Sequence, residues 1–249
     1  MLGVLNLNFL KFESIKLFIM KSLLTVLILF TLSTGYSQTD CKPYVPATVG
    51  STWELTNYSK KDKATGRTAY ELLELMEGTE KMTFKIKVTS FDDKDEEVYV
   101  NTCEAYCVNG VFDFGMEFMM DGSTMSAYEE MDVEVDASKF EIPTLTEPTG
   151  TELADGELIV AIGKDGMNMF TMKVYVTDRL IEAREEQQTE AGTFDCIVLS
   201  QKVSTRLLFK IESSSKEWYA EEVGLVRSES YDKKGKLTGY SVLTKIDRK

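Results

Sequence analysis

The pattern that most constrains the fold is a β-hairpin near the C-terminus, in residues 218–246. Residues 224–230 alternate in the manner of a strand. Residues 237–246 form a return strand in which Tyr240, Val242 and Ile246 recur at period two, as in a strand with one buried face. The intervening residues 232–235 read Asp-Lys-Lys-Gly, which combines polar residues with a glycine that tolerates the backbone of a tight reversal. The stretch predicts a hairpin that closes a sheet.

Similar strand patterns recur along the rest of the chain, whereas helical periodicity is rare. Apolar and polar residues alternate at 84–89, and Asn109-Gly110 separates two further runs. That dipeptide is a strong hairpin signal because both residues tolerate positive φ. About ten to twelve short strands are expected. The predicted fold class is all-β or β-dominated α+β, a curved antiparallel sheet with at most a short helix, for which residues 126–130 are the candidate.

Three short segments near the C-terminus carry a family resemblance: WYA at 218–220, VGLVR at 223–227 and YDKKGK at 231–236. They resemble the C-terminal signature of the TapB-like family of exported bacterial proteins, whose function is undefined. The resemblance implies a half-barrel-like sheet similar to that of lipoprotein carriers. The resemblance implies neither a set of catalytic residues nor a particular ligand.

The N-terminal region has the order of a secretory signal. Lys21 precedes an apolar run at 23–32, and small residues follow at 35–37, so cleavage is expected after Ser37. Met20 is a candidate for the true start. The apolar run is shorter than the roughly 20 residues of a membrane-spanning helix, so no stable membrane span is expected after cleavage.

The predicted organisation is therefore a signal peptide at 1–37 and a single β-rich domain at 38–249, located in the periplasm or secreted. The whole chain has a formal net charge of −13. A strongly acidic protein is repelled by nucleic acid and by anionic membrane surfaces, so neither is an expected partner.

Four cysteines, an even number, are disulfide candidates in an oxidising compartment: Cys41, Cys103, Cys107 and Cys196. They allow three complete pairings. If Cys103 and Cys107 lie on one strand, their Cα atoms are about 13 Å apart, too far for a disulfide. Each would then pair elsewhere or remain a buried thiol.

The chain contains no histidine, which excludes Ser-His-Asp and Cys-His catalysis and histidine metal sites. The acidic run at 92–97 lacks the ordered spacing of a calcium loop. Methionine clusters at 116–125 and 167–172 are more typical of core filler than of Cu(I) ligands. The sequence predicts no cofactor, no metal and no enzyme, although paired carboxylates leave a hydrolase as the least favoured alternative.

Two functions remain open. In the first, a binding module holds an apolar or extended ligand on a concave sheet face lined by Phe84, Val174, Phe209 and Trp218. In the second, the sheet is a structural scaffold of the cell envelope that binds another envelope protein. An open cavity would favour the first, whereas a segment such as 122–131 plugging the sheet would favour the second.

Overall fold

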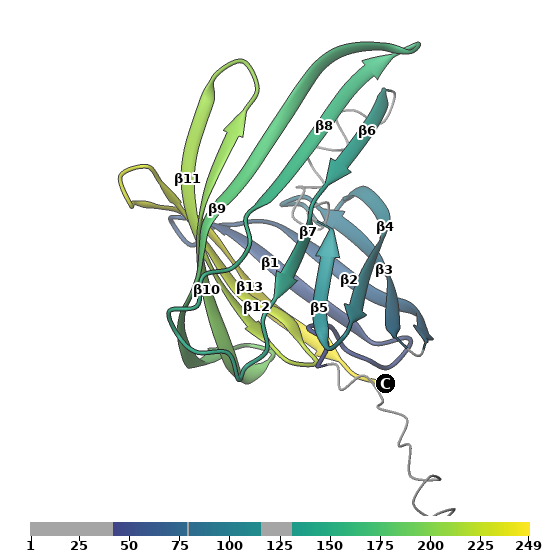
Figure 1. Ribbon diagram of the computed structural model, residues 1–249, viewed down its shortest axis with the longest axis vertical. Helices are drawn as coiled ribbons and strands as arrows, with labels where there is room; N and C mark the ends of the chain where they lie inside the picture. Colours follow the sequence, from purple (N-terminus) through teal and green to yellow (C-terminus); the bar gives the residue numbers. More distant parts are fainter. Residues whose placement is uncertain (1–41, 79, 116–130) are drawn as a thin grey trace, which may run out of the picture. The chain divides into compact units, whose positions relative to one another are not determined.

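The computed structural model describes residues 42–78, 80–115 and 131–249. Thirteen strands form one antiparallel sheet (Figure 1). The strands are β1 (Thr52–Ser59), β2 (Ala64–Glu77), β3 (Lys81–Phe91), β4 (Glu97–Val108), β5 (Val111–Gly115), β6 (Asp132–Ala137), β7 (Lys139–Ile142), β8 (Gly156–Lys164), β9 (Met167–Thr189), β10 (Gly192–Arg206), β11 (Lys210–Ala220), β12 (Gly224–Asp232) and β13 (Leu237–Asp247). The described residues contain no helix, so the all-β prediction is confirmed.

The strand order is β6-β8-β9-β10-β11-β12-β13-β1-β2-β3-β4-β5-β7, an open sheet with β6 and β7 at its two ends. These two strands are nevertheless consecutive in the chain and are separated by Ser138 alone. The Ser138 N–H donates to the carbonyl of Glu157 at 2.8 Å, and the Glu157 N–H donates to Ser138 Oγ at 2.9 Å. The chain therefore connects the two ends of the curved sheet at one corner.

The C-terminal hairpin forms as predicted and joins the two halves of the sheet, because β13 pairs with both β12 and β1. The Asp232 N–H donates to Lys236 O at 2.9 Å, and Gly235 has a φ of 72°. In this position, glycine avoids the steric cost that a side chain would bring.

The prediction that Tyr240, Val242 and Ile246 share one face is wrong. The pairing of β1 with β13 shifts between Glu54 and Leu55, which marks a β-bulge. A bulge inserts one extra residue and reverses the alternation beyond it. Tyr240 therefore stacks on Tyr58 on the outer face of the sheet, while Ile246 pairs with Trp53 on the inner face.

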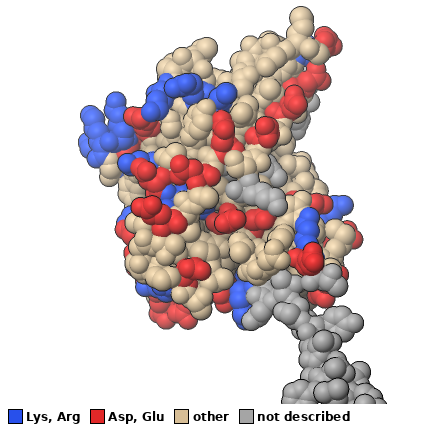
Figure 2. All heavy atoms as spheres, viewed as in Figure 1, with Lys and Arg blue, Asp and Glu red and all other residues tan. Residues whose placement is uncertain are grey.

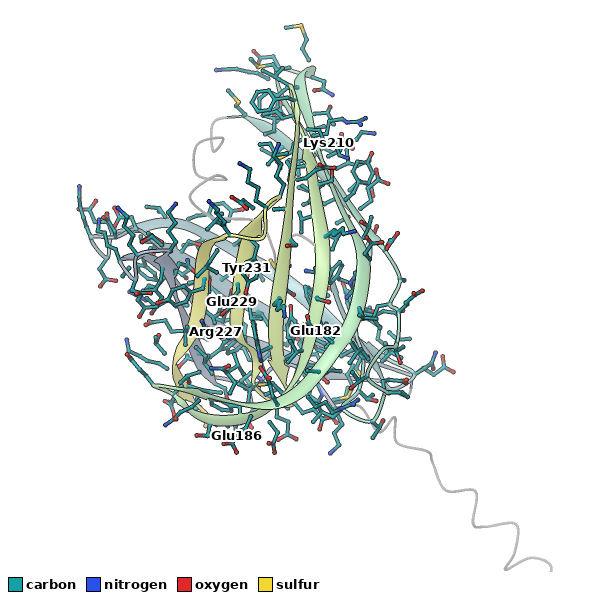
Figure 3. All side chains as sticks on the ribbon, turned by 90° about the vertical axis from the view of Figure 1, so that its left-hand side faces the viewer. Glu182, Glu186, Lys210, Arg227, Glu229 and Tyr231 are labelled. Atoms are coloured by element: carbon teal, nitrogen blue, oxygen red, sulfur yellow. The ribbon has the colours of Figure 1, made fainter. Side chains whose placement is uncertain are left out.

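Charged and aromatic side chains cover the outer face of β12 (Figure 3). Arg227 donates two hydrogen bonds to Glu229, which also accepts one from Tyr231. The Arg227 guanidinium lies 5.0 Å from the ring centroid of Tyr240. Because alternate residues of a strand point to opposite faces, Ser228 and Ser230 point inward.

The apolar core lies inside the curve of the sheet. The Phe84 ring meets Phe112 edge-on with centroids 5.9 Å apart, and Phe114 lies 5.8 Å from Phe140. Tyr44, from the segment before β1, packs against Phe112 and donates to Pro143 O at 2.7 Å. Among the described residues, no helix is long and apolar enough to span a membrane.

Candidate functional site

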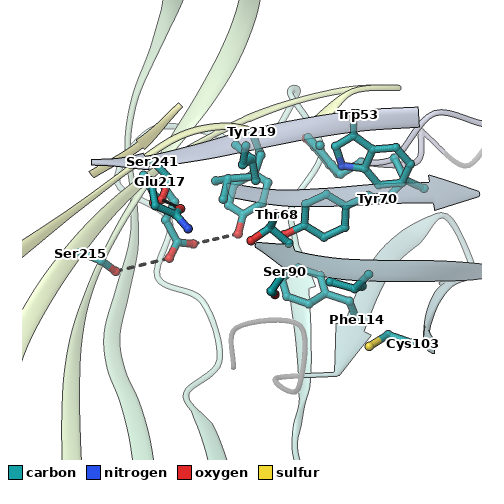
Figure 4. A pocket seen from close by; sticks show the side chains of 18 of the residues that line it. Trp53, Thr68, Tyr70, Ser90, Cys103, Phe114, Ser215, Glu217, Tyr219 and Ser241 are labelled. Carbon is teal, nitrogen blue, oxygen red and sulfur yellow. Dashed lines mark hydrogen bonds between the residues drawn. The ribbon is translucent and has the colours of Figure 1, made fainter. Parts of the chain in front are cut away.

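A cavity of about 670 Å³ opens on the inner face of the sheet, next to the core (Figure 4). Its lining residues come from β1 to β6 and from β10 to β13, with Tyr44 and Val45 added from the N-terminal segment. Its size is within the range of small-molecule sites. The two ends of the cavity differ in chemistry.

One end is aromatic and apolar. Trp53 and Tyr70 lie on neighbouring strands and stack with centroids 5.2 Å apart. Phe112, Phe114 and Leu55 complete this end. Burial raises the pKa of Tyr70 above its usual value, so its hydroxyl stays neutral at physiological pH.

The other end is rich in hydroxyl groups. Ser215 pairs with Ser230 across β11 and β12, and Ser228 pairs with Ser241 across β12 and β13. Ser241 Oγ donates to Asn57 Oδ1 at 2.6 Å on the next strand. Serine side chains are short, so a row of them along neighbouring strands leaves open space above the sheet while offering donors and acceptors.

Glu217 is the central polar residue of this end and is only 5% exposed. Its carboxyl group accepts hydrogen bonds from Tyr219 Oη at 2.8 Å and Gln201 Nε2 at 2.9 Å. Ser215 Oγ lies 3.5 Å away. Burial raises the pKa of Glu217, although the Tyr219 hydrogen bond and the charge of Arg179 oppose this effect. Burial also raises the pKa of Tyr219.

Two buried polar atoms close to Glu217 make no hydrogen bond within the described part of the chain: Gln201 Oε1 and Arg179 Nε. The rest of the Arg179 guanidinium is well held, because it donates to Glu141 O and Ala154 O, each at 2.8 Å, and lies 3.5 Å above the Phe140 ring. Buried polar atoms normally have partners. The region around Glu217 therefore has unused hydrogen-bonding capacity.

None of the four residues predicted from the sequence to line a concave face lines this cavity. Phe84 is fully buried in the core, and Val174 is half-buried on β9. Phe209 is 70% exposed in the turn between β10 and β11. Trp218 is buried on the outer side, where Nε1 donates to Glu185 at 2.6 Å. The structure does not bring these residues together.

Trp218 lies outside the cavity for a simple reason. Period-two alternation shows that Trp218 faces away from Glu217 and Tyr219, but it does not show which of the two faces is concave. The residues missed were the serines and Glu217. Their signal was present in the sequence, because 213–215 is a run of three serines, Glu217 follows two residues later, and serines alternate at 228 and 230.

The structure describes three of the four disulfide candidates, Cys103, Cys107 and Cys196. Cys103 and Cys196 are buried thiols, and Cys103 accepts a hydrogen bond from Asn101 Nδ2 at 3.6 Å. Burial raises the pKa of Cys196 to about 12. Cys103 and Cys107 share β4, as expected. Cys41 lies outside the described residues, as do the signal segment 1–37, the first methionine cluster and most of the candidate plug at 122–131.

Comparison with known families gives one match, a model described as DUF3108-like, over residues 48–243. This chain belongs to the DUF3108-like family. The more specific resemblance to the TapB-like family stays a prediction. No match was found among curated proteins.

Two solved structures share the fold of this family member. A candidate lipoprotein from Parabacteroides distasonis is 22% identical and aligns over 84% of this chain and 100% of its own, with a TM-score of 0.75. A candidate exported protein with a YmcC-like fold from Bacteroides fragilis is 24% identical over 83% of this chain and 100% of its own, with a TM-score of 0.73. At these identities the similarity shows the fold alone.

Proposed function

We propose that this protein is a non-catalytic binding module of the bacterial cell envelope that holds an extended ligand in the cavity inside its curved sheet. The observation that carries the proposal is the two-ended cavity of about 670 Å³. A ligand with an apolar part and a hydroxyl-bearing part matches its lining. The apolar part would pack against Trp53, Tyr70 and Phe112, and the polar part would meet the serines and Glu217.

Two independent observations support the envelope location. The N-terminal residues have the order of a secretory signal. The two solved structures with the same fold are described as a candidate lipoprotein and a candidate exported protein. A periplasmic or secreted protein of this kind meets ligands that the cytoplasm does not offer.

The alternative functions have weaker support. A carboxylate-dependent hydrolase needs two converging acids, and Glu217 is the one carboxylate among the described residues that line the cavity. A pure scaffold would need neither the cavity nor its aligned hydroxyl groups. Binding therefore accounts for more of the described inner face than either alternative.

Native mass spectrometry tests the proposal directly. The chain from Gln38 is purified from the periplasm without detergent, and its intact mass is compared with its mass after organic extraction. We expect a stoichiometric, extractable adduct whose mass identifies the ligand class. A bare mass on a folded protein would shift the function to a scaffold that binds another envelope protein.

A matched pair of variants tests whether the adduct occupies the cavity. Ser228→Phe places a bulky side chain among the lining residues. Ser200→Phe makes the same change at a half-buried position of β10 that does not line the cavity. The adduct should be lost from the first variant and retained by the second. Retention by both would place the ligand elsewhere.

The same intact mass also shows how many of the cysteines form disulfides. Because Cys103 and Cys196 are buried thiols, a disulfide between Cys41 and Cys107 is the pairing that stays available. The expected result is one disulfide and two thiols that react with an alkylating agent only after unfolding. Four reactive thiols would contradict this pairing.

A further inference from the structure

The most exposed large apolar side chain of the described residues, Leu208, lies at the tip of the β10–β11 hairpin. Leu208 is 89% exposed, and Phe209 is 70% exposed; Leu207 and Ile211 flank them and are also exposed. Leu207, Leu208 and Phe209 form the turn between β10, which ends at Arg206, and β11, which begins at Lys210. Apolar residues gathered at a projecting turn are unusual on a protein surface and mark an interaction site.

Two basic residues lie at the base of this tip. Arg206 and Lys210 lie directly below it and face each other across the hairpin. Lys210 forms an ion pair with Glu212 at 2.6 Å, and its position near the end of the hairpin is visible in Figure 3. The apolar tip is therefore held above a pair of cationic side chains.

The neighbouring turns extend the basic surface. Ser213 pairs with Asp232, which places the β12–β13 turn beside the start of β11. Ser59 pairs with Gly239, which places the β1–β2 turn next in the row. The two turns carry exposed lysines, with one aspartate each: Lys233, Lys234 and Lys236 with Asp232, and Lys60, Lys61 and Lys63 with Asp62.

Counted over 206–210, 232–236 and 60–63, each of these three turns has a net charge of +2, in a chain whose net charge is −13. Two of these cations are ion-paired, Lys210 with Glu212 and Lys63 with Asp93 of the acidic β3–β4 turn. Figure 2 shows Lys and Arg side chains gathered over the β10–β11 and β12–β13 hairpins, with Asp and Glu spread over the surface below. Beyond about 8 Å, physiological salt screens exposed charges from one another. A partner at these turns would therefore meet a positive surface despite the acidity of the whole protein.

We infer that this edge of the sheet docks on a bilayer containing anionic phospholipid, with Leu207, Leu208 and Phe209 inserted among the lipids and the basic turns against the headgroups. An apolar anchor and a basic patch are the two signals that together give stable peripheral attachment. The inference differs from the expectation that anionic membranes repel the protein, because that expectation rests on the net charge of the whole chain. It is independent of whether the cavity holds a ligand.

Vesicle flotation tests the inference on the chain from Gln38, since residues 39–249 form one compact unit and the N-terminal apolar run would itself bind lipid. The vesicles are phosphatidylcholine alone or phosphatidylcholine with phosphatidylglycerol. We expect binding to the mixed vesicles at least about tenfold stronger than to phosphatidylcholine, and weaker binding as salt is raised. Failure of the folded protein to bind the mixed vesicles would overturn the inference and point to a protein partner.

Two variants test the apolar anchor and the basic turns separately. The apolar variant replaces Leu207, Leu208 and Phe209 with serine, and the charge variant is Lys233→Glu, Lys234→Glu and Lys236→Glu. Each should weaken binding by about tenfold or more. Only the charge variant should lose the preference for anionic lipid, while the apolar variant should keep it.

Matched controls lie at the opposite ends of the strands. Val49→Ser with Val111→Ser removes two exposed apolar side chains there. Lys42→Glu, Arg248→Glu and Lys249→Glu make the same charge change on exposed residues. Both controls should bind the mixed vesicles within about twofold of the unaltered protein. Equal losses in the controls and in the tip variants would show a non-specific charge effect and would overturn the proposed site.

Discussion

At the scale of single residues, Glu217 is the most informative side chain of the molecule. It is buried, accepts hydrogen bonds from Tyr219 and Gln201, and faces a cavity otherwise lined by neutral groups. Burial raises its pKa because the charged form loses its hydration. A carboxyl group in this setting can accept hydrogen bonds when ionised and donate one when neutral.

Glu217→Gln should therefore become more stable than the unaltered protein as the pH rises. The raised pKa means that the folded state favours the protonated Glu217 carboxyl. The protonated carboxyl therefore stabilises the fold fully below the pKa of the unfolded state, and this stabilisation is lost as the pH rises through the pKa of the folded state. A tenfold difference in proton affinity between the folded and unfolded states corresponds to about 1.4 kcal/mol. Urea unfolding between pH 5 and 8 measures the difference, since glutamine keeps the hydrogen-bonding shape without ionising.

Glu229→Gln is the control with the opposite sign. Burial raises the pKa of Glu229, but hydrogen bonds from Tyr231 and Arg227 outweigh this and leave it lowered. The fold thus favours the ionised Glu229 carboxylate. Its contribution to the free energy of unfolding is present above the pKa of the unfolded state and is lost as the pH falls through the pKa of the folded state. If the free energy of unfolding of Glu217→Gln changed with pH in parallel with that of the unaltered protein, Glu217 would have the same pKa in the folded and unfolded states.

At the scale of elements, three hairpin turns of one edge share one hydrogen-bonding pattern. In the β12–β13 turn, the N–H of Asp232 donates to the carbonyl of Lys236. The equivalent bonds join Ser59 to Lys63 and Asp92 to Glu96. The β1–β2 and β12–β13 turns also share a Lys-Lys pair, at 60–61 and at 233–234. The acidic run at 92–97 belongs to the same turn geometry, with Asp92 Oδ1 accepting from two backbone N–H groups.

The turn between β11 and β12 is tighter and depends on Gly224. This glycine has a φ of 103°, and a Cβ there would lie 2.7 Å from the carbonyl oxygen of Tyr44. Gly224→Ala should lower the free energy of unfolding by about 2 kcal/mol or more, because both backbone strain and a clash with main chain oppose it. Urea unfolding checks the value.

Gly235→Ala provides the comparison. Its φ of 72° is also positive, but an added Cβ would meet nothing within 4 Å. Backbone strain alone should lower the free energy of unfolding of Gly235→Ala by about 1 kcal/mol. Equal losses for the two variants would mean that the contact with Tyr44 does not hold the turn in place.

At the scale of the whole sheet, the two ends are brought together by more than the corner at Ser138. Arg179 extends from β9 to the carbonyl of Glu141 on β7, at the far end of the strand order, and covers the Phe140 ring. It is 2% exposed. Burial lowers the pKa of its guanidinium, and interactions with Tyr219, Glu217 and two further acids, Glu141 and Asp155, oppose this effect.

Arg179→Met should destabilise the fold by about 2–4 kcal/mol, because the fold loses two charge-assisted hydrogen bonds from a buried guanidinium to Glu141 O and Ala154 O. Hydrogen exchange should also accelerate at the amides of β7. Arg184→Met is the matched control, since Arg184 is exposed and donates to Leu145 O from the surface. It should change stability by no more than about 1 kcal/mol. Unaltered exchange in β7 of Arg179→Met would contradict the bridging role.

The sequence by itself determined the fold class, the C-terminal hairpin and the placement of Cys103 and Cys107 on one strand. These features depend on local alternation and on turn residues such as Gly235, whose conformational preferences act within a few residues. The sequence also contained the small polar residues of the inner face, although their role was not recognised.

Only the tertiary structure decided which face is concave and which residues share it. A strand pattern is symmetric between its two faces, and one bulge beside Leu55 reverses the alternation of Tyr240 and Ile246. Trp218 lies on the other face of its strand from the cavity, and Phe209 lies in the β10–β11 turn and not on a strand. Glu217 and the serines of β11, β12 and β13 line one cavity because these neighbouring strands pair. The basic edge likewise arises from three turns distant in sequence that strand pairing places in one row.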